Sequence, residues 1–178
     1  FPTETVYGLG VIFDSKEAFQ NLVHIKRRRP DKPFTLMCSS VEEIDKYAFV
    51  NETARKIIRH FLPGELTIIL NTRPDVPEWV DLGTGHIGIR VPDDKVVQKM
   101  IGLVGKPLLV PSANRADQRP LTKDDEVIAE FDGEIAGIVA GQSKGATPST
   151  VISAYDKIVL LRQGNLRLDE ILKTIGGE

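Results

Sequence analysis

The amino-acid sequence predicts a layered α/β fold in a single domain. Short runs rich in β-branched and apolar residues alternate with segments of helical periodicity, which is typical of layered α/β structure and not of a helix bundle or a β-sandwich. The chain has 178 residues, of which 41% are hydrophobic and 27% are charged. This size allows a sizeable core and is too short to favour two domains, so we expect one domain over residues 1–178.

The expected elements follow from periodicity and from capping residues. Strands are expected at Val6–Phe13, Phe34–Cys38, Leu66–Asn71, Ile87–Val91, Pro107–Val110, Thr150–Ala154 and Ile158–Arg162. Helices are expected at Ser15–Arg28, Val41–Ala48, Glu52–Leu62, Asp94–Leu103, Asp124–Phe131 and Asp169–Ile175. Ser40 and Glu43 have the spacing of a capping box, and Asn51 is placed to cap the helix that follows it. The longest irregular stretches, Arg73–His86 and Asn114–Lys123, contain Pro or Gly and are expected to be surface or cleft-lining loops.

The composition argues against several classes of protein. No segment approaches the roughly 20 apolar residues of a membrane span, and neither a signal peptide nor a lipidation motif is visible. We therefore expect a cytoplasmic protein with no membrane partner, although the chain opens at Phe1 rather than Met, which leaves its natural start open. The single cysteine, Cys38, rules out an internal disulfide framework and a thiolate metal cage, and a buried structural thiol is expected there.

A basic cluster near the end of the first expected helix indicates an anion-binding role. The chain carries a net charge of only −2, yet five cations fall within seven residues: Lys26, Arg27, Arg28, Arg29 and Lys32. A local excess of this kind is expected to serve a local purpose, and we interpret it as part of an anion site.

Helical periodicity predicts that one member of this cluster, Lys26, points toward the protein interior. Phe19, Leu22 and Val23 share an apolar face, and Lys26 follows Leu22 by four positions, at the centre of the same stripe. Lys26 is therefore expected to be neutralised, to reach an edge or to face a cavity, whereas Arg27 diverges toward solvent.

The chain is expected to leave this helix soon after Lys26. Pro30 disfavours helical backbone at the residue before it, so Arg28 should lie over whatever Lys26 faces. The alternative for the whole cluster is a solvated basic helix end that complements the helix dipole.

A second polar cluster follows an apolar strand segment in the sequence PLLVPSAN. Ser112 offers a hydroxyl group and Asn114 an amide, suited to a ribose, a phosphate or an amino-acid carboxylate. The carboxyl ends of strands are common ligand sites in α/β sheets. The alternative is a turn in which Ser112 and Asn114 bond only their own backbone.

Together these segments resemble the YrdC-like family, the L-threonylcarbamoyladenylate (threonylcarbamoyl-AMP) synthases. The resemblance covers nearly the whole chain: FPTETVYGLG, K-x-R followed by D-K-P-F, PGELTIIL, IGIRVP, LLVPSAN, PSTVI and LLRQG occur in the family's order. It implies a twisted sheet of mixed parallel and antiparallel strands flanked by helices, with a concave basic cleft. The chain length implies the short, single-domain type.

The resemblance also implies an ATP-dependent synthesis. Family members combine L-threonine, bicarbonate and ATP into L-threonylcarbamoyladenylate and pyrophosphate. A separate transferase complex then moves the threonylcarbamoyl group to tRNA. ATP is implied as a substrate, with Mg²⁺ held mainly by its phosphates and by water.

Several positions match residues that face the substrates in this family. The implied catalytic tetrad is Lys26, Arg28, Ser112 and Asn114. The implied nucleotide contacts are Arg28, Lys32, His86, Asn114, Thr122 and Arg162. The implied threonine contacts are Thr5, Arg90, Ser112 and Ser149. Met37 stands where many members have His, and no role is assigned to it.

Three of these positions also have a simpler interpretation. Thr5 could satisfy a strand edge, Arg90 could be a surface charge at a strand end, and His86 could be a solvated loop residue.

No residue set for covalent catalysis is visible, and no protein metal site is expected, because His24, His60 and His86 lack metal-ligand spacing. We therefore interpret the mechanism as positioning and electrostatic stabilisation.

Two other functions compete with the synthase. A protein that binds double-stranded RNA or tRNA without synthase activity would use the basic cluster on phosphates, but the chain is slightly acidic and only 6% aromatic. Carbamoyl transfer through carbamoyladenylate occurs in multidomain relatives, whose additional modules are not in this sequence.

Arg27 inside K-x-R and the run FTLMC resemble the YciO branch of the same fold.

Overall fold

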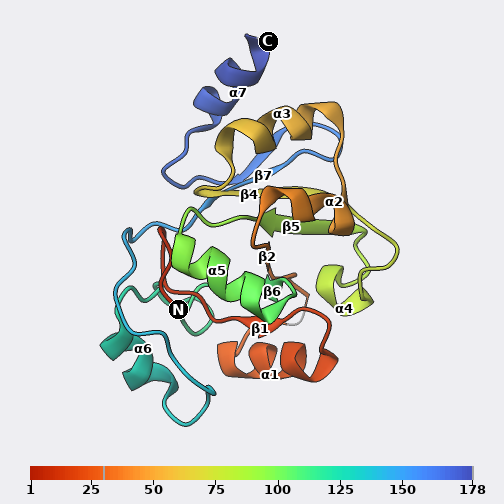
Figure 1. Ribbon diagram of the computed structural model, residues 1–178. Coiled ribbons are helices and arrows are strands. Elements are labelled where there is room, and N and C mark those ends of the chain that lie inside the picture. Colours follow the sequence, from red (N-terminus) through yellow and green to blue (C-terminus); the bar gives the residue numbers. More distant parts are fainter. Residues whose placement is uncertain (30, 178) are drawn as a thin grey trace.

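The computed structural model describes residues 1–29 and 31–177, and within these residues eight strands form one sheet (Figure 1). The strand order is β1-β6-β2-β5-β4-β7-β8, and β3 pairs with β4 beside this path. The strands are β1 (Val11–Ile12), β2 (Leu36–Met37), β3 (Ala48–Phe49), β4 (Leu66–Thr72), β5 (His86–Arg90), β6 (Leu108–Leu109), β7 (Thr150–Ser153) and β8 (Val159–Arg162). Pairs β2–β5 and β4–β7 are parallel and the other pairs are antiparallel, which confirms the mixed sheet.

Helices flank this sheet, as predicted. They are α1 (Lys16–Lys26), α2 (Ile44–Tyr47), α3 (Glu52–Phe61), α4 (Glu78–Asp81), α5 (Lys95–Val104), α6 (Asp124–Phe131) and α7 (Leu168–Gly176). Helix α1 lies against β1, and α3 packs against α7 near the C-terminus (Figure 1). None of the helices within the described residues is long and apolar enough to cross a membrane.

The two central strands, β4 and β5, carry the core on one face of the sheet. Ile68 pairs in register with Ile89, and Leu70 with Ile87, and all four side chains are fully buried. Because side chains alternate along a strand, Thr67, Ile69 and Gly88 lie on the opposite face. That opposite face is available for a ligand.

The first helix begins as predicted and ends earlier than predicted. The Ser15 hydroxyl accepts a hydrogen bond from the amide of Ala18, but α1 ends at Lys26 and not at Arg28. Arg27 has left-handed backbone dihedrals (φ 50°, ψ 36°) and its amide donates to the His24 carbonyl, which closes the helix. The prediction that Pro30 ends the helix falls on a residue outside those described.

Two predicted elements differ from the structure in extent or regularity. The strand expected at Val6–Phe13 is reduced to β1, since the amide of Tyr7 donates to Leu121 and that of Leu9 to Pro111. The helix expected at Val41–Ala48 consists of a 3₁₀ turn (Val41–Glu43), the four-residue α2 and the first residue of β3.

Of the two capping predictions, one is confirmed and one is wrong. In addition, one of the expected loops contains a helix. Asn51 caps α3 as expected, accepting from the amide of Ala54 at 2.8 Å. The capping box is wrong, because Ser40 makes no side-chain cap and Glu43 accepts from the amide of Ser39. The expected loop Arg73–His86 contains α4.

Cys38 is buried, as predicted. Burial raises the pKa of its thiol far above the ordinary value, and the nearby Glu43 adds to this shift, so the thiol stays protonated and unreactive.

Candidate active site

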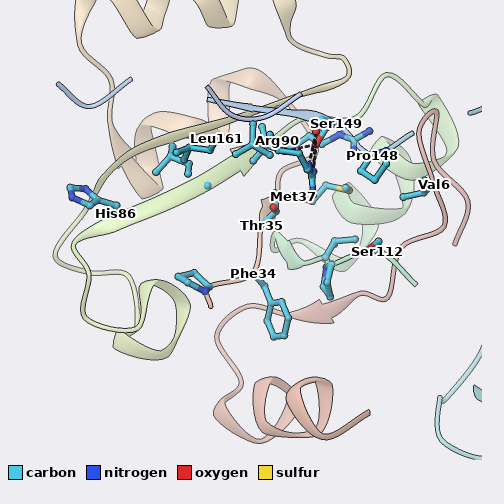
Figure 2. A pocket seen from close by; sticks show the side chains of 18 of the residues that line it. Val6, Phe34, Thr35, Met37, His86, Arg90, Ser112, Pro148, Ser149 and Leu161 are labelled. Carbon is cyan, nitrogen blue, oxygen red and sulfur yellow. Dashed lines mark hydrogen bonds between the residues drawn. The ribbon is translucent and has the colours of Figure 1, made fainter. Parts of the chain in front are cut away.

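A cavity of about 460 Å³ opens on the face of the sheet opposite the core (Figure 2). Its floor is formed by Thr67 and Ile69 of β4, Gly88 of β5 and Val151 of β7. A Cβ atom at Gly88 would lie 3.3 Å from the Cγ2 atom of Thr67, so a larger residue at this position would crowd the floor. The walls come from segments far apart in sequence, among them Arg28, Phe34, Met37, His86, Arg90, Pro111, Ser112, Ser149, Tyr155, Leu161 and Arg162.

Three arginines line the cavity: Arg28, Arg90 and Arg162. Burial lowers the pKa of Arg162, and the charges of Arg90 and Arg28 lower it further, so Arg162 is repelled by both of these guanidinium groups. None of the described residues that line the cavity is Asp or Glu. A polyanionic ligand would relieve this repulsion.

Arg28 is half-buried at the mouth of the cavity. Its guanidinium lies 5.1 Å from the centre of the Phe34 ring and donates to the Pro33 carbonyl at 3.4 Å. Burial lowers its pKa, whereas Asp31 raises it. Its buried Nε atom has no hydrogen-bond partner among the described residues.

Arg90, at the end of β5, is held by two residues from the N-terminal segment. The Arg90 side chain is 7% exposed, and its Nη2 atom lies 2.8 Å from Glu4 Oε1 and 2.9 Å from Thr5 Oγ1. Glu4 Oε1 also accepts from the amide of Asp93. The ion pair with Glu4 therefore fixes the orientation of the Arg90 side chain. Its buried Nε atom has no hydrogen-bond partner in the part of the chain described.

Arg162, on β8, is attached to Ser149. Its Nε and Nη2 atoms donate to the Ser149 carbonyl at 3.0 and 2.9 Å, and Nη2 also donates to Ser149 Oγ at 3.2 Å. Ser149 Oγ lies 2.8 Å from the hydroxyl of Thr67, which places a second hydroxyl group on the cavity floor. Figure 2 shows Ser149 and Arg90 close together in the cavity wall.

Lys26 connects the two polar clusters found in the sequence. It is 2% exposed, and its ammonium nitrogen donates to the carbonyls of Ser112 at 2.6 Å and Asn114 at 2.7 Å. It lies 3.4 Å from Asn114 Oδ1, which accepts from Ser112 Oγ at 2.6 Å. Burial lowers the Lys26 pKa to about 8, and the charge of Arg28 contributes. The inward orientation predicted from helical phase is confirmed, but the amine bonds protein carbonyls and does not line the cavity.

His86 and Tyr155 stack at the opposite end of the cavity. Their ring centres are 3.8 Å apart and the rings are nearly parallel, at 10°. Both line the cavity together with Leu161, and His86 lies toward that end in Figure 2. This end is more apolar than the arginine end and suits a flat ring or an aliphatic group.

Most of the site residues expected from the sequence lie in or beside the cavity. Six line it: Arg28, His86, Arg90, Ser112, Ser149 and Arg162. Thr5 does not line the cavity but accepts a hydrogen bond from Arg90, which does. Lys26 and Asn114 do not line it either, and both form hydrogen bonds with Ser112. Lys32 is exposed and Thr122 lies near the start of α6, and neither is among the lining residues. The interpretation of Arg90 as a surface charge is wrong.

Sequence reasoning missed several residues of this site. Glu4 pairs with Arg90, Thr67 pairs with Ser149, and Phe34 and Tyr155 supply the aromatic walls. The alternation in β4 could have placed Thr67 on the face opposite the core. No local signal could have paired Glu4 with a residue 86 positions later.

The described residues contain no group of three or more His, Cys, Asp or Glu side chains that could hold a metal ion. The polar atoms at the cavity are mostly cationic or neutral donors, which suit anions better than Mg²⁺.

The chain is similar in sequence to proteins of a known family. A family model described as "Sua5_yciO_yrdC: Telomere recombination" matches residues 1–164. The threonylcarbamoyl-AMP synthase of Bacillus subtilis (strain 168) is 37% identical over 180 residues, which cover 99% of this chain and 52% of that protein.

Two solved structures are also similar. P. abyssi Sua5 complexed with L-threonine matches with a TM-score of 0.94 and 35% identity over 99% of this chain and 53% of that one. E. coli YciO matches with a TM-score of 0.84 and 27% identity over 97% of this chain and 85% of that one. The chain spans about half the length of the B. subtilis and P. abyssi proteins.

Proposed function

The chain belongs to the Sua5/YciO/YrdC family, and on that premise we propose that it makes L-threonylcarbamoyladenylate and pyrophosphate from L-threonine, bicarbonate and ATP. The observation that carries the proposal is the set of three arginines around a cavity whose described lining residues include no carboxylate. All three substrates are anionic or carry a carboxylate, so a cationic cleft both collects them and stabilises charge on the leaving pyrophosphate.

The amino acid would bind at the Arg90 end of the cavity. Arg90 is held by Glu4 and Thr5 and lines the cavity, where its guanidinium group suits a carboxylate. The hydroxyls of Ser112 and Ser149 are nearby donors and acceptors for the substrate's amine and hydroxyl groups. The complex of P. abyssi Sua5 with L-threonine supports this choice of amino acid.

The nucleotide would bind with its phosphates between Arg28 and Arg162. Asn114 accepts a hydrogen bond from Ser112 and is proposed to hold Ser112 in position in the cavity wall. His86, at the apolar end, is proposed to contact the nucleotide. Lys32 and Thr122 lie on flanking loops and are proposed as outer nucleotide contacts. Any Mg²⁺ would be held by phosphate oxygens and water, because the cavity lining has no carboxylate to ligate it.

The reaction needs two bond-forming steps. The threonine amine forms an N–C bond with bicarbonate and releases water, which gives a carbamate. A carbamate oxygen then attacks the α-phosphorus of ATP as pyrophosphate leaves. The protein's part is positioning and charge stabilisation: Arg28 and Arg162 stabilise the negative charge on the departing phosphates. We propose that a separate tRNA-modifying transferase complex uses the product.

The test is pyrophosphate release from purified protein with each substrate omitted in turn. The expected result is release of pyrophosphate from ATP only when L-threonine and bicarbonate are both present. Equal release without threonine, or none with folded protein, would contradict the proposal. Salt-dependent binding of duplex RNA that ATP and threonine fail to displace would instead favour an RNA-binding protein.

A further inference from the structure

We propose that Arg115 is a positioning residue that fixes Lys26 and the Ser112–Asn114 loop to Glu130 of α6 and to Glu134 in the turn that follows this helix. The inference concerns how the proposed synthase site is held in place, so its kinetic consequences rest on the proposed function. Arg115 follows Asn114 directly but does not line the cavity. Its side chain is directed away from the cavity, toward α6.

The Arg115 guanidinium is buried and all five of its N–H groups are used. Nε donates to Glu130 Oε1 at 2.6 Å, and Nη2 donates to Glu134 Oε1 at 2.6 Å and to the Glu130 carbonyl at 2.7 Å. Nη1 donates to Glu134 Oε2 at 3.1 Å and to the carbonyl of Ile25. The group also lies 4.4 Å from the centre of the Phe131 ring. The side chain is only 6% exposed, so this bonding sets one orientation.

These bonds join the end of α1 to the Ser112–Asn114 loop beside Lys26. Ile25, whose carbonyl accepts from Arg115, directly precedes Lys26. The amide of Ala116 donates to the Lys26 carbonyl at 2.8 Å, while the Lys26 ammonium group bonds the carbonyls of Ser112 and Asn114. The side chain of Asn114 donates to the Arg115 carbonyl at 2.7 Å.

Helix α6 is the anchor of this arrangement. Its buried residues Val127 and Phe131 fix it to the core. Glu130 on the helix and Glu134 in the turn after it present their carboxylates to Arg115. The Arg115 ion pair holds the pKa of Glu134 below its ordinary value, so this carboxylate stays charged at neutral pH. Loss of the Glu134 contact should therefore let the loop and the end of α1 shift relative to each other.

The first test is Glu134→Ala, with Asp45→Ala as the matched control. Glu134 is 41% exposed, so its truncation leaves no large cavity. Asp45 forms a similar two-bond pair with Arg55, at 3.1 and 2.8 Å, on a part of the fold outside the cavity. Glu134→Ala is expected to lower kcat for pyrophosphate formation about tenfold with KM values for ATP and threonine within about twofold of wild type. Asp45→Ala should leave all three values unchanged.

The conservative variant Glu134→Gln keeps an acceptor for Arg115 and should recover part of the lost kcat. If Glu134→Ala and Asp45→Ala behave alike, or if Glu134→Ala lowers only the Tm while kcat per folded molecule is unchanged, the role is merely structural and the inference is overturned.

A second measurement does not depend on catalysis. Hydrogen exchange of the Ala116 amide, which bonds the Lys26 carbonyl, should be at least about tenfold faster in Glu134→Ala and unchanged in Asp45→Ala. Unchanged Ala116 exchange in Glu134→Ala would overturn the inference. If the wild-type protein releases no pyrophosphate, the proposed function fails, and this exchange measurement alone decides the positioning role.

Discussion

The ammonium nitrogen of Lys26 lies 2.6 Å from the carbonyl oxygen of Ser112, 86 positions later in the chain. This contact joins the basic cluster and the polar loop that the sequence presents as separate features. It also changes the role expected for Lys26, because the amine holds the loop that carries Ser112 and Asn114 and does not open into the cavity. Arg28, two residues later, lines the cavity instead.

Replacing Lys26 with Met should inactivate the proposed synthase by releasing this loop. Met keeps most of the side-chain length but donates no hydrogen bond, which leaves the carbonyls of Ser112 and Asn114 unpaired. We expect pyrophosphate formation to fall at least about 100-fold. Lys16→Met, an exposed position on the same helix, is the control and should keep wild-type activity. Wild-type activity in Lys26→Met would show that the loop does not need this contact.

Lys26 should also make stability depend on pH in the alkaline range. Burial lowers its pKa to about 8 from the ordinary value of 10.5. Between these two values the unfolded chain binds more protons than the folded chain at this residue, so its contribution to the free energy of unfolding rises with pH; below about pH 8 the contribution is constant. Relative to Lys26→Met, the wild type should gain about 2 kcal/mol between about pH 7.5 and 9.5.

Urea unfolding of both proteins across this range measures the difference directly. The comparison with Lys26→Met cancels the titration of other groups, such as Tyr7, whose pKa is raised by burial and by Asp124. Parallel stability curves for the two proteins would show that the Lys26 pKa is not lowered in the folded state.

Replacing Arg162 with Lys should weaken nucleotide binding while keeping the charge. Arg162 is held by hydrogen bonds from two nitrogens to Ser149, a geometry that a single ammonium group cannot reproduce. We expect the KM for ATP to rise about tenfold and the free energy of unfolding to change little. Arg167→Lys, which affects an exposed arginine paired with Asp169, is the control. An unchanged KM for ATP in Arg162→Lys would remove Arg162 from the proposed phosphate site.

Predictions based on local patterns were confirmed where short-range contacts decide the structure. The cap at Asn51, the inward phase of Lys26 and the strand at Leu66–Asn71 all depend on neighbours within a few positions. The strand predicted at Val6–Phe13 was wrong over most of its length, because distant backbone groups compete for its hydrogen bonds. The amide of Tyr7 shows this competition, because it bonds Leu121, which no local pattern identifies.

The sequence by itself determined the α/β class, the position of the core strands and the residue types that an anion site needs. Only the tertiary structure decided which of those residues meet. In the folded chain Glu4 pairs with Arg90, and Thr67 pairs with Ser149. The Lys26 ammonium group donates to backbone carbonyls, whereas Arg28 lines the cavity. The physical reason is that periodicity and capping are set by neighbours along the chain. A buried charge, in contrast, is stabilised by whichever groups the packed sheet brings within hydrogen-bond distance.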